Sequence, residues 1–212
     1  MKGMVIYGAG GHARELLFQL HAERGASCVV AMVDDIKPDR TIDGISILNY
    51  EQAAARYRGC LWFAAIGDNV VRADLLAKIR RDGIQLGGFI SARAIVAPSA
   101  KIQSTAQIFA GSVISANCVL AENVIVNFNC VISHDVKIGA NSALAPRAAI
   151  AGHVTVGQRV WIGVGACISN GKLAKPLCIG DRAVIGAGAC VVSDVPSDQT
   201  VVGVPARPVT RR

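Results

Sequence analysis

The chain has 212 residues, of which 52% are hydrophobic, and it carries a formal net charge of +7. This hydrophobic content is enough for a buried core, so the composition excludes an intrinsically disordered chain. No window reaches the roughly 18 consecutive apolar residues of a membrane span, and the start has no apolar run of signal-peptide length, so we expect a cytoplasmic protein without membrane insertion.

Charge and cysteine content narrow the class further. Residues 1–89 hold 11 Lys and Arg against 10 Asp and Glu, whereas residues 90–212 hold 11 against 5. A basic second half suits nucleic acid, an anionic membrane or a phosphorylated small molecule, and net charge alone does not distinguish these partners. The seven cysteines form no C-x-x-C pair, which indicates packed thiols in a reducing compartment.

Residues 1–89 alternate strand-like and helix-like patterns. In chain order we predict strands at MVIYG, CVVAMVDD, ISIL, LWFAAIG and 84–90, with helices at 13–22, shortly after 49 and at 70–81. This alternation predicts a small Rossmann-like α/β domain with a parallel sheet.

The first strand-to-helix turn of this domain is GAGGHA. It matches the pattern G-x-G-x-x-G/A through Gly8, Gly10 and Ala13, and Asp34 and Asp35 follow about twenty residues later. Glycines let the backbone approach a phosphate at a helix N-terminus, and a carboxylate that ends the second strand accepts hydrogen bonds from ribose or base. Some ninety residues supply little more than one mononucleotide half, which disfavours NAD and favours a nucleotide-sugar; a tight turn that binds no ligand is the alternative.

Residues 90–212 repeat with a period of six. Aliphatic residues recur from Val96 to Ile168, and after an eleven-residue step, SNGKLAKPLCI, the series resumes from Ile179 to Val191. A small or slim residue stands four places after each aliphatic, from Ala100 to Val195. Short strands joined by tight corners, three to a coil and with coils about 4.8 Å apart, produce this period. The segment therefore predicts a triangular parallel β-helix of somewhat over five coils.

These features together resemble one family. A Rossmann-like domain with GAGGHA and VDD, followed by repeats that contain VNFNCVISHD and close on VVGVPARPV, resembles the bacterial sialic acid O-acetyltransferase/nucleotide-aminosugar N-acetyltransferase family over nearly all 212 residues. The resemblance implies a nucleotide-sugar-binding domain at 1–89, a left-handed β-helix acyltransferase domain with a C-terminal tail at 90–212, acetyl-CoA as acyl donor, and a homotrimer with active sites between subunits.

The resemblance also implies a reaction. The expected activity is N-acetylation of the 4-amino group of a nucleotide-linked 4-amino-4,6-dideoxyhexose, for surface glycan or glycoprotein synthesis. O-acetylation of sialic acid or another sugar is the alternative, and a non-catalytic nucleotide-sugar-binding protein is a more remote one.

The stretch ISHDVKIG places His134 and Asp135 at or near a corner of a coil, two positions after the core residue Ile132. A histidine that points outward there can accept a proton from a reacting amine near neutral pH, and Asp135 can orient it. Eighteen residues later, Gly152 offers a backbone N–H to the oxyanion that develops on a thioester. The resemblance implies these same roles.

Further site residues follow from the same matching. For the nucleotide sugar they are Gly8, Gly10, Gly11, His12, Asp34, Asp35, Gly67, Asn69 and Asn127. For coenzyme A we expect Gly152, Ala143 (where some members carry a second histidine) and the cations Lys172, Lys175, Arg182 and Arg207, which suit phosphate groups. An exposed polar loop is the alternative reading of the two lysines.

Zinc-dependent carbonic anhydrases built on hexapeptide repeats are the rival enzyme class for this β-helix architecture. They need three histidine ligands, and the repeat segment has only His134 and His153. We therefore expect no metal cofactor, and no nucleic acid partner. His21 is interpreted as structural. For His153, beside Gly152, the alternatives are contact with substrate, exposure to solvent and a structural role.

Overall fold

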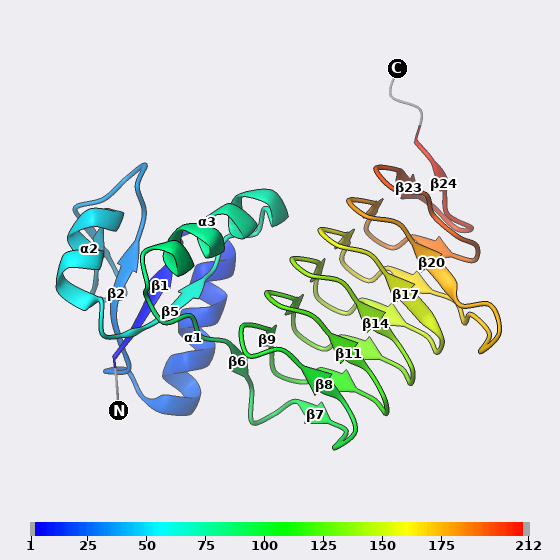
Figure 1. The fold of residues 1–212 in the computed structure, drawn as a ribbon, viewed down its shortest axis with the longest axis horizontal. Coiled ribbons are helices and arrows are strands. Elements are labelled where there is room, and N and C mark those ends of the chain that lie inside the picture. The colour runs from blue at the N-terminus through cyan, green and yellow to red at the C-terminus, as the bar shows by residue number, and fades with distance from the viewer. Residues whose placement is uncertain (1–2, 210–212) are drawn as a thin grey trace. The chain divides into compact units, whose positions relative to one another are not determined.

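The chain forms two compact units, Met1–Gly88 and Phe89–Arg212, and the computed structural model describes residues 3–209 (Figure 1). The sequence placed this boundary one residue later. Among the described residues, no helix has the length and apolar character to cross a membrane.

The first unit is a five-stranded sheet with three helices. Its strands are β1 (Met4–Tyr7), β2 (Val29–Val33), β3 (Arg40–Ile42), β4 (Ile45–Leu48) and β5 (Leu61–Ala64), and its helices are α1 (Gly11–Arg24), α2 (Tyr50–Tyr57) and α3 (Asn69–Arg81). The strand order is β3-β4-β2-β1-β5, and all pairs are parallel except β3 with β4. This confirms the Rossmann-like prediction and corrects the expectation of an entirely parallel sheet.

The antiparallel pair has a local cause. Asp43 and Gly44, both with positive φ, form a two-residue turn between the paired residues Ile42 and Ile45, as in a type I′ hairpin. The strand predicted at 84–90 is also wrong. Leu86 makes one isolated bridge to Trp62, and residues 89–90 are the first strand of the second unit.

The second unit is a left-handed β-helix of three parallel sheets, as predicted. The β7 face contains β7 (Ile95–Val96), β10 (Val113–Ile114), β13 (Val131–Ile132), β16 (Ala149–Ile150), β19 (Cys167–Ile168) and β22 (Cys190–Val191). The β8 face contains β8 (Lys101–Ile102), β11 (Val119–Leu120), β14 (Lys137–Ile138), β17 (Val154–Val156) and β20 (Leu177–Ile179). The β6 face contains β6 (Phe89–Ile90), β9 (Gln107–Ile108), β12 (Ile125–Val126), β15 (Ala143–Leu144), β18 (Trp161–Ile162), β21 (Val184–Ile185), β23 (Thr200–Val202) and an antiparallel edge strand, β24 (Arg207–Pro208).

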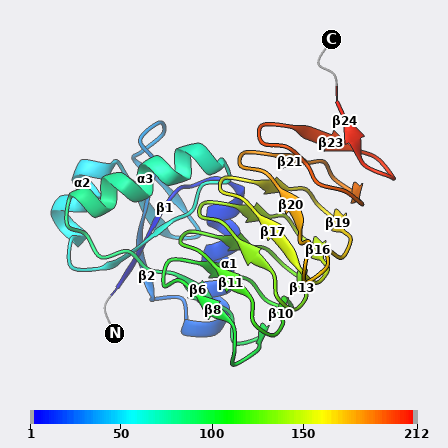
Figure 2. The same cartoon turned by 45° about the vertical axis from the view of Figure 1, so that its right-hand side comes forward.

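The period-six pattern forms the core of this prism. Aliphatic residues such as Ile132 and Ile150 stack inward in successive coils, and the small residues two positions before them, Cys130 and Ala148, belong to the same buried core. Figure 2 shows β10, β13, β16 and β19 running side by side.

The corners of the coils use left-handed backbone. Asn117, Asp135 and His153 occupy equivalent corner positions after successive strands of the β7 face, with φ of 59°, 59° and 56°. Asparagine and aspartate tolerate this conformation better than most residues, which explains their recurrence in the repeats. Eighteen-residue spacing therefore stacks corner side chains in columns, so that residues far apart in the sequence become neighbours.

The eleven-residue step forms a hairpin in which Lys172 and Lys175 pair antiparallel, after which Leu177 pairs with Val154. The next coil is shorter, because Ile179 pairs with Val195 only sixteen residues later. Val195 thus takes the core position of its coil, which corrects its expected place in the small-residue column.

Candidate functional site

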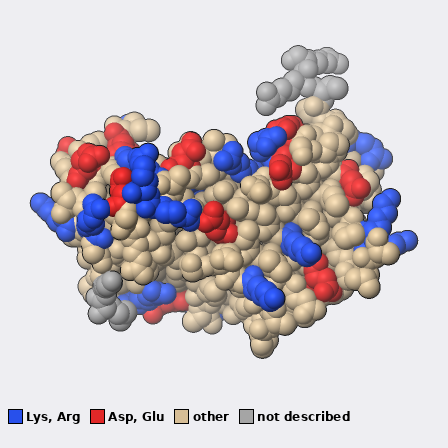
Figure 3. Space-filling view, viewed as in Figure 1, with Lys and Arg blue, Asp and Glu red and all other residues tan. Residues whose placement is uncertain are grey.

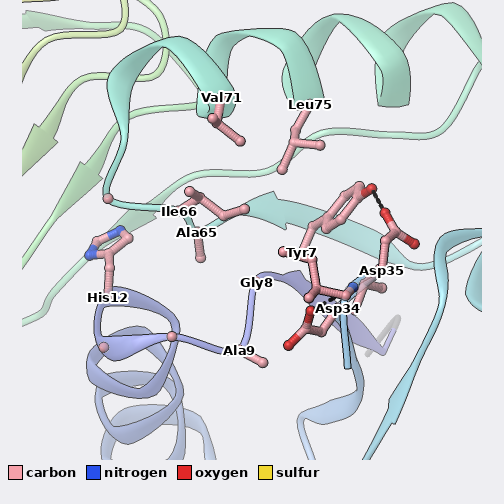
Figure 4. Close-up of a pocket in the computed structure, with 15 residues that line it drawn as sticks. Tyr7, Gly8, Ala9, His12, Asp34, Asp35, Ala65, Ile66, Val71 and Leu75 are labelled. Atoms are coloured by element: carbon pink, nitrogen blue, oxygen red, sulfur yellow. Dashed lines mark hydrogen bonds between the residues drawn. The ribbon is translucent and has the colours of Figure 1, made fainter. Parts of the chain in front are cut away.

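A cavity of about 350 Å³ opens in the first unit where β1, β2 and β5 end (Figure 4). Such a crevice at the carboxyl ends of parallel strands is where open α/β sheets bind ligands. Its lining includes seven of the predicted nucleotide-sugar residues: Gly8, Gly10, Gly11, His12, Asp34, Asp35 and Gly67.

The glycines of GAGGHA have two different functions. Gly8 has a φ of 137°, and a Cβ there would lie 2.3 Å from the carbonyl oxygen of Ala65, so only glycine fits between β1 and β5. At Gly10 and Gly11 a Cβ would meet no atom within 4 Å. The backbone at the N-terminus of α1 is therefore open to the cavity, as phosphate binding requires.

The carboxylates of Asp34 and Asp35 have different hydrogen-bond partners. Asp35 accepts hydrogen bonds from the Tyr7 hydroxyl and, at 2.7 Å, from the Tyr50 amide. Burial and the hydrogen bond to Asp35 raise the pKa of Tyr7, so its hydroxyl remains a donor. In Figure 4 Asp34 lies beside Ala9, whereas Asp35 points away toward the Tyr7 hydroxyl. Asp34 is also engaged, because its Oδ1 accepts from the amides of Ile36 and Lys37 and its Oδ2 pairs with Arg40 at 2.9 Å. Both carboxylates therefore help to hold the wall of the cavity that follows β2.

Asn69 does not line the cavity. It is buried, and its Oδ1 accepts from Nη2 of the fully buried Arg72 at 2.8 Å. Arg72 also donates to the carbonyl oxygens of Ile66 at 2.9 Å and Gly67 at 3.3 Å. Burial lowers the pKa of Arg72 to about 10. Arg72 therefore holds the loop that forms one wall of the cavity, a function for which a helical arginine in the sequence gives no signal.

In the second unit, His134 and Asp135 form a direct pair. Nδ1 of His134 lies 2.8 Å from Oδ2 of Asp135, and Asn117, one coil earlier, donates from Nδ2 to Oδ1 of Asp135 at 3.2 Å. The hydrogen bond with His134, and then the one with Asn117, hold the pKa of Asp135 below its usual range. An ionised Asp135 fixes the proton of His134 on Nδ1 and leaves Nε2 as the acceptor.

Gly152 lies directly against this imidazole. A Cβ at position 152 would be 2.5 Å from Cε1 and 2.6 Å from Nε2 of His134. Within residues 3–209 the Gly152 N–H donates to no protein group. A base and an available amide donor therefore lie at the same corner.

His153 also lies at this corner, as its predicted alternative of contact with substrate requires. Its Nδ1 is 3.9 Å from Oδ2 of Asp135, and its ring meets that of His134 edge-on at 5.0 Å between centroids. The eighteen-residue spacing between Asp135 and His153 is the signal that would have found it.

The residues expected to contact coenzyme A are divided among several places. The Lys172–Lys175 hairpin continues the His134 corner, since Gly171 N–H donates to the Gly152 carbonyl at 3.0 Å. Arg182 lies at a different corner and binds Asp198 with two contacts of 2.6 Å, and Arg207 is on β24. On the face seen in Figure 3, basic side chains stand apart from one another over the coils rather than gathering in one patch.

Two more predicted residues lie away from the His134 corner. Ala143 is a buried residue of β15 on the β6 face, and Asn127 follows β12, where its Oδ1 accepts from the Phe128 amide at 2.7 Å. One chain therefore brings together only part of the predicted site. A groove of about 270 Å³ does adjoin the His134 corner on the β7 face, lined by Ser133, Ala151, Cys167 and Ser169 among others.

Comparison with known proteins adds independent information. A family model described as the PglD N-terminal domain matches residues 4–79. A comparison with curated protein sequences gives no match.

Several solved structures are similar over the whole chain. A perosamine N-acetyltransferase variant from Caulobacter crescentus, in complex with CoA and GDP-perosamine, is 34% identical, with 100% of this chain and 98% of that chain covered and a TM-score of 0.90. WeeI from Acinetobacter baumannii AYE is 27% identical, with coverage of 99% and 100% and a TM-score of 0.94. The acetyltransferase domain of PglB from Neisseria gonorrhoeae FA1090, in complex with acetyl coenzyme A, is 28% identical, with coverage of 98% and 99% and a TM-score of 0.88.

Proposed function

The chain belongs to the nucleotide-aminosugar N-acetyltransferase family, and we propose that it acetylates the 4-amino group of a nucleotide-linked 4-amino-4,6-dideoxyhexose. It is an acetyltransferase that uses acetyl-CoA as co-substrate. The deoxy sugar is the acceptor class that the sequence resemblance implies, for surface glycan or glycoprotein synthesis. The proposed location is the cytoplasm, as the sequence predicts.

The observation that carries the chemistry is the His134–Asp135 pair packed on Gly152. Asp135 holds the Nδ1 proton of His134, and Nε2 takes the proton of the sugar amine as its nitrogen attacks the thioester carbonyl. The carbonyl oxygen becomes an oxyanion that accepts from the Gly152 N–H. Collapse of this intermediate breaks the carbon–sulfur bond, and the coenzyme A thiolate leaves with the proton held by His134.

The cavity of the first unit supplies the proposed grip on the nucleotide. The open backbone at Gly10 and Gly11 suits the diphosphate, and His12 and Asp34 line the same cavity. Binding energy from the nucleotide, which does not react, then positions the sugar amine for attack.

We extend the proposal to a homotrimer with active sites between subunits. The outward positions of the β7 face are apolar: Ile95, Val113, Val131, Ala149, Cys167 and Cys190. The β8 face presents Lys101, Val119, Lys137, Thr155 and Cys178 at equivalent positions, so polar side chains interrupt it. Closed symmetry buries an apolar face without open-ended growth, and a neighbouring chain packed on this face would cover the groove beside His134.

A substrate panel tests this function. The enzyme is incubated with acetyl-CoA and with UDP-, dTDP- or GDP-linked 4-amino-4,6-dideoxyhexoses, the 4-hydroxy counterparts, and the free amino sugars, and the mass gain of one acetyl group is followed. We expect acetylation of a nucleotide-linked amine alone. Equal acetylation of the 4-hydroxy compounds would overturn the proposal that the acetyl group is transferred to nitrogen. Equal acetylation of free sugars would overturn the proposal that the substrate is bound through its nucleotide.

A further inference from the structure

The corner at His134 contains more ligand atoms than general-base catalysis uses. Potential ligand atoms of His134, Asp135 and His153 all lie within 4.8 Å of one another. The expectation of no metal considered histidines alone as ligands. The fold brings the carboxylate of Asp135 beside the two imidazoles as a third potential ligand. Two imidazoles and a carboxylate form a donor set that suits zinc and its first-row neighbours.

From this cluster we propose that His134, Asp135 and His153 bind a divalent transition-metal ion of the zinc type, and that the bound ion inhibits acetyl transfer.

The distances suit such an ion. With metal–ligand bonds of about 2.0–2.2 Å, the ligand atoms of a tetrahedral site are about 3.4 Å apart. Oδ2 of Asp135 is 2.8 Å from Nδ1 of His134 and 3.9 Å from Nδ1 of His153, so these separations bracket the required value. The ligand atoms of the two imidazoles lie within 4.8 Å of each other, so the side chains must rotate to bring all three atoms to this separation.

The corner also holds its carboxylate in place and leaves room for a further ligand. Asn117 occupies Oδ1 of Asp135 and leaves Oδ2 facing both imidazoles. The side chains of His134, Asp135 and His153 are 53%, 38% and 24% exposed. An ion can therefore enter from solvent and keep water as its fourth ligand.

Inhibition follows because the two ring nitrogens of His134 share one proton, and metal binding changes which of them carries it. This step rests on the proposed function. In the active pair, Nδ1 carries the proton and Nε2 is the acceptor for the amine proton. When a metal takes the lone pair of Nδ1, the imidazole proton moves to Nε2, with no net change in protons on the ring. Nε2 then becomes a donor, and the base for the sugar amine is lost.

The test measures binding separately from activity. Zn²⁺ is titrated into the metal-free full chain by calorimetry, and Co²⁺ is used as an optical probe of the ligand set. The surface pair Cys167 and Cys190 is a second place for a thiophilic ion, and Co²⁺ bound there would give thiolate charge-transfer bands. Acetyl transfer is then assayed over the same range of Zn²⁺ concentration.

His153→Asn is the diagnostic variant, because asparagine suits the left-handed backbone at position 153 and removes one ligand. His21→Asn, on α1, is the matched control. We expect one Zn²⁺ per chain, cobalt bands without thiolate character, and affinity at least about 10-fold weaker in His153→Asn, since loss of an outer-shell partner alone has an effect of that size. Inhibition, expressed relative to the metal-free rate of each variant, should weaken by the same factor.

Each other result has a definite meaning. No saturable binding, thiolate-type cobalt spectra, or equal affinity in His153→Asn and the unmodified chain would overturn the metal site. Binding without inhibition, in an enzyme that needs His134, would overturn the inhibition mechanism. A chain that binds Zn²⁺ as expected but acetylates no substrate of the panel would contradict the proposed function and leave the metal site supported.

Discussion

His134 depends on the residue one coil above it as much as on its neighbour in the sequence. The imidazole occupies the space in which any side chain at position 152 would begin. A Cβ at position 152 would lie 2.5 Å from Cε1 of this ring, so a methyl group and the imidazole cannot both keep these positions. The glycine therefore serves two purposes, space for the base and an available N–H.

Gly152→Ala should lower kcat by about 10-fold or more, because the added methyl group displaces the imidazole from its bond to Asp135. The backbone of Gly152 is not in the left-handed region, so we expect the melting temperature to change little. Steady-state kinetics and thermal unfolding measure the two effects. Gly59→Ala, where a Cβ meets nothing within 4 Å, is the control, and an unchanged kcat in Gly152→Ala would refute the packing argument.

His134→Ala should lower kcat by about 10²–10⁴, the usual contribution of a general base, and leave the fold intact. Asp135→Asn should have a smaller effect, since it alters the orientation and tautomer of the base without removing it. Single-turnover rates with saturating substrates separate chemistry from binding. Near-normal turnover by a folded His134→Ala enzyme would remove His134 from the mechanism.

At the scale of elements, Asp35 joins three of them. It follows β2, accepts from Tyr7 on β1, and accepts from the first residue of α2. Tyr7 is almost fully buried, so its hydroxyl has no access to water if this partner is lost. The carboxylate therefore contributes to the stability of the first unit.

Asp35→Ala should reduce the free energy of unfolding of the first unit by about 1–3 kcal/mol, the usual penalty for a buried donor left without a partner. Denaturant titration followed by the fluorescence of the two tryptophans measures the change, with Asp74→Ala on the exposed side of α3 as control. Equal stability of the two variants would show that the Tyr7 hydroxyl finds another acceptor.

The core of the β-helix makes its stability sensitive to alkaline pH. Burial raises the pKa of the Cys130 thiol from 9.0 to about 11. Between these values the unfolded chain loses the proton and the folded chain keeps it, so stability is complete below pH 9 and falls as the pH rises toward 11. The loss attributable to this group is about 2–3 kcal/mol at its limit.

Cys130→Ala should therefore unfold with a shallower dependence of stability on pH between 9 and 11. Alanine already occurs in the same column at Ala148, so the substitution suits the site. Cys178→Ala, at an exposed thiol, should keep the slope of the unmodified chain. Identical slopes for Cys130→Ala and the unmodified chain would show that Cys130 ionises freely in the folded state.

The sequence predicts elements well where one physical requirement recurs. Every coil needs an aliphatic residue inward, so the period of six revealed the β-helix and its hairpin insertion. Val195 was misplaced because its coil is two residues shorter, and this shortening lies at the end of the series, where no later repeats reveal the change of register. The β3–β4 hairpin was missed although Asp43–Gly44 is a turn signal.

Side-chain function was harder to predict than the fold. The roles of Arg72 and Asp35 depend on hydrogen bonds to backbone groups outside their own elements, in the loop before α3 and at the start of α2, that no local pattern encodes. His153 could have been found, because the period that built the helix also places it above Asp135.

At the scale of the whole molecule, the contrast between the β7 and β8 faces determines the expected assembly. Val131→Asp, on the apolar β7 face, should convert the proposed trimer to monomers and lower activity with it. Val119→Asp is a matched control on the β8 face, since the two valines are 44% and 39% exposed. Sedimentation velocity at micromolar concentration measures both. A monomeric unmodified chain, or a trimer that survives Val131→Asp alone, would contradict assembly through this face.

The stacking of the coils also gives the second unit a mechanical direction. Backbone hydrogen bonds between strands such as β10, β13 and β16 all run along the axis of the prism. Tension applied to the two ends of this unit loads one coil at a time, so the coils peel away in succession at a low and nearly constant force. A pull across the axis must instead shear several coils together. The second unit, which holds His134 beside the Gly152 amide, is therefore stiff around each coil. Its coils separate more easily when the unit is pulled along its axis.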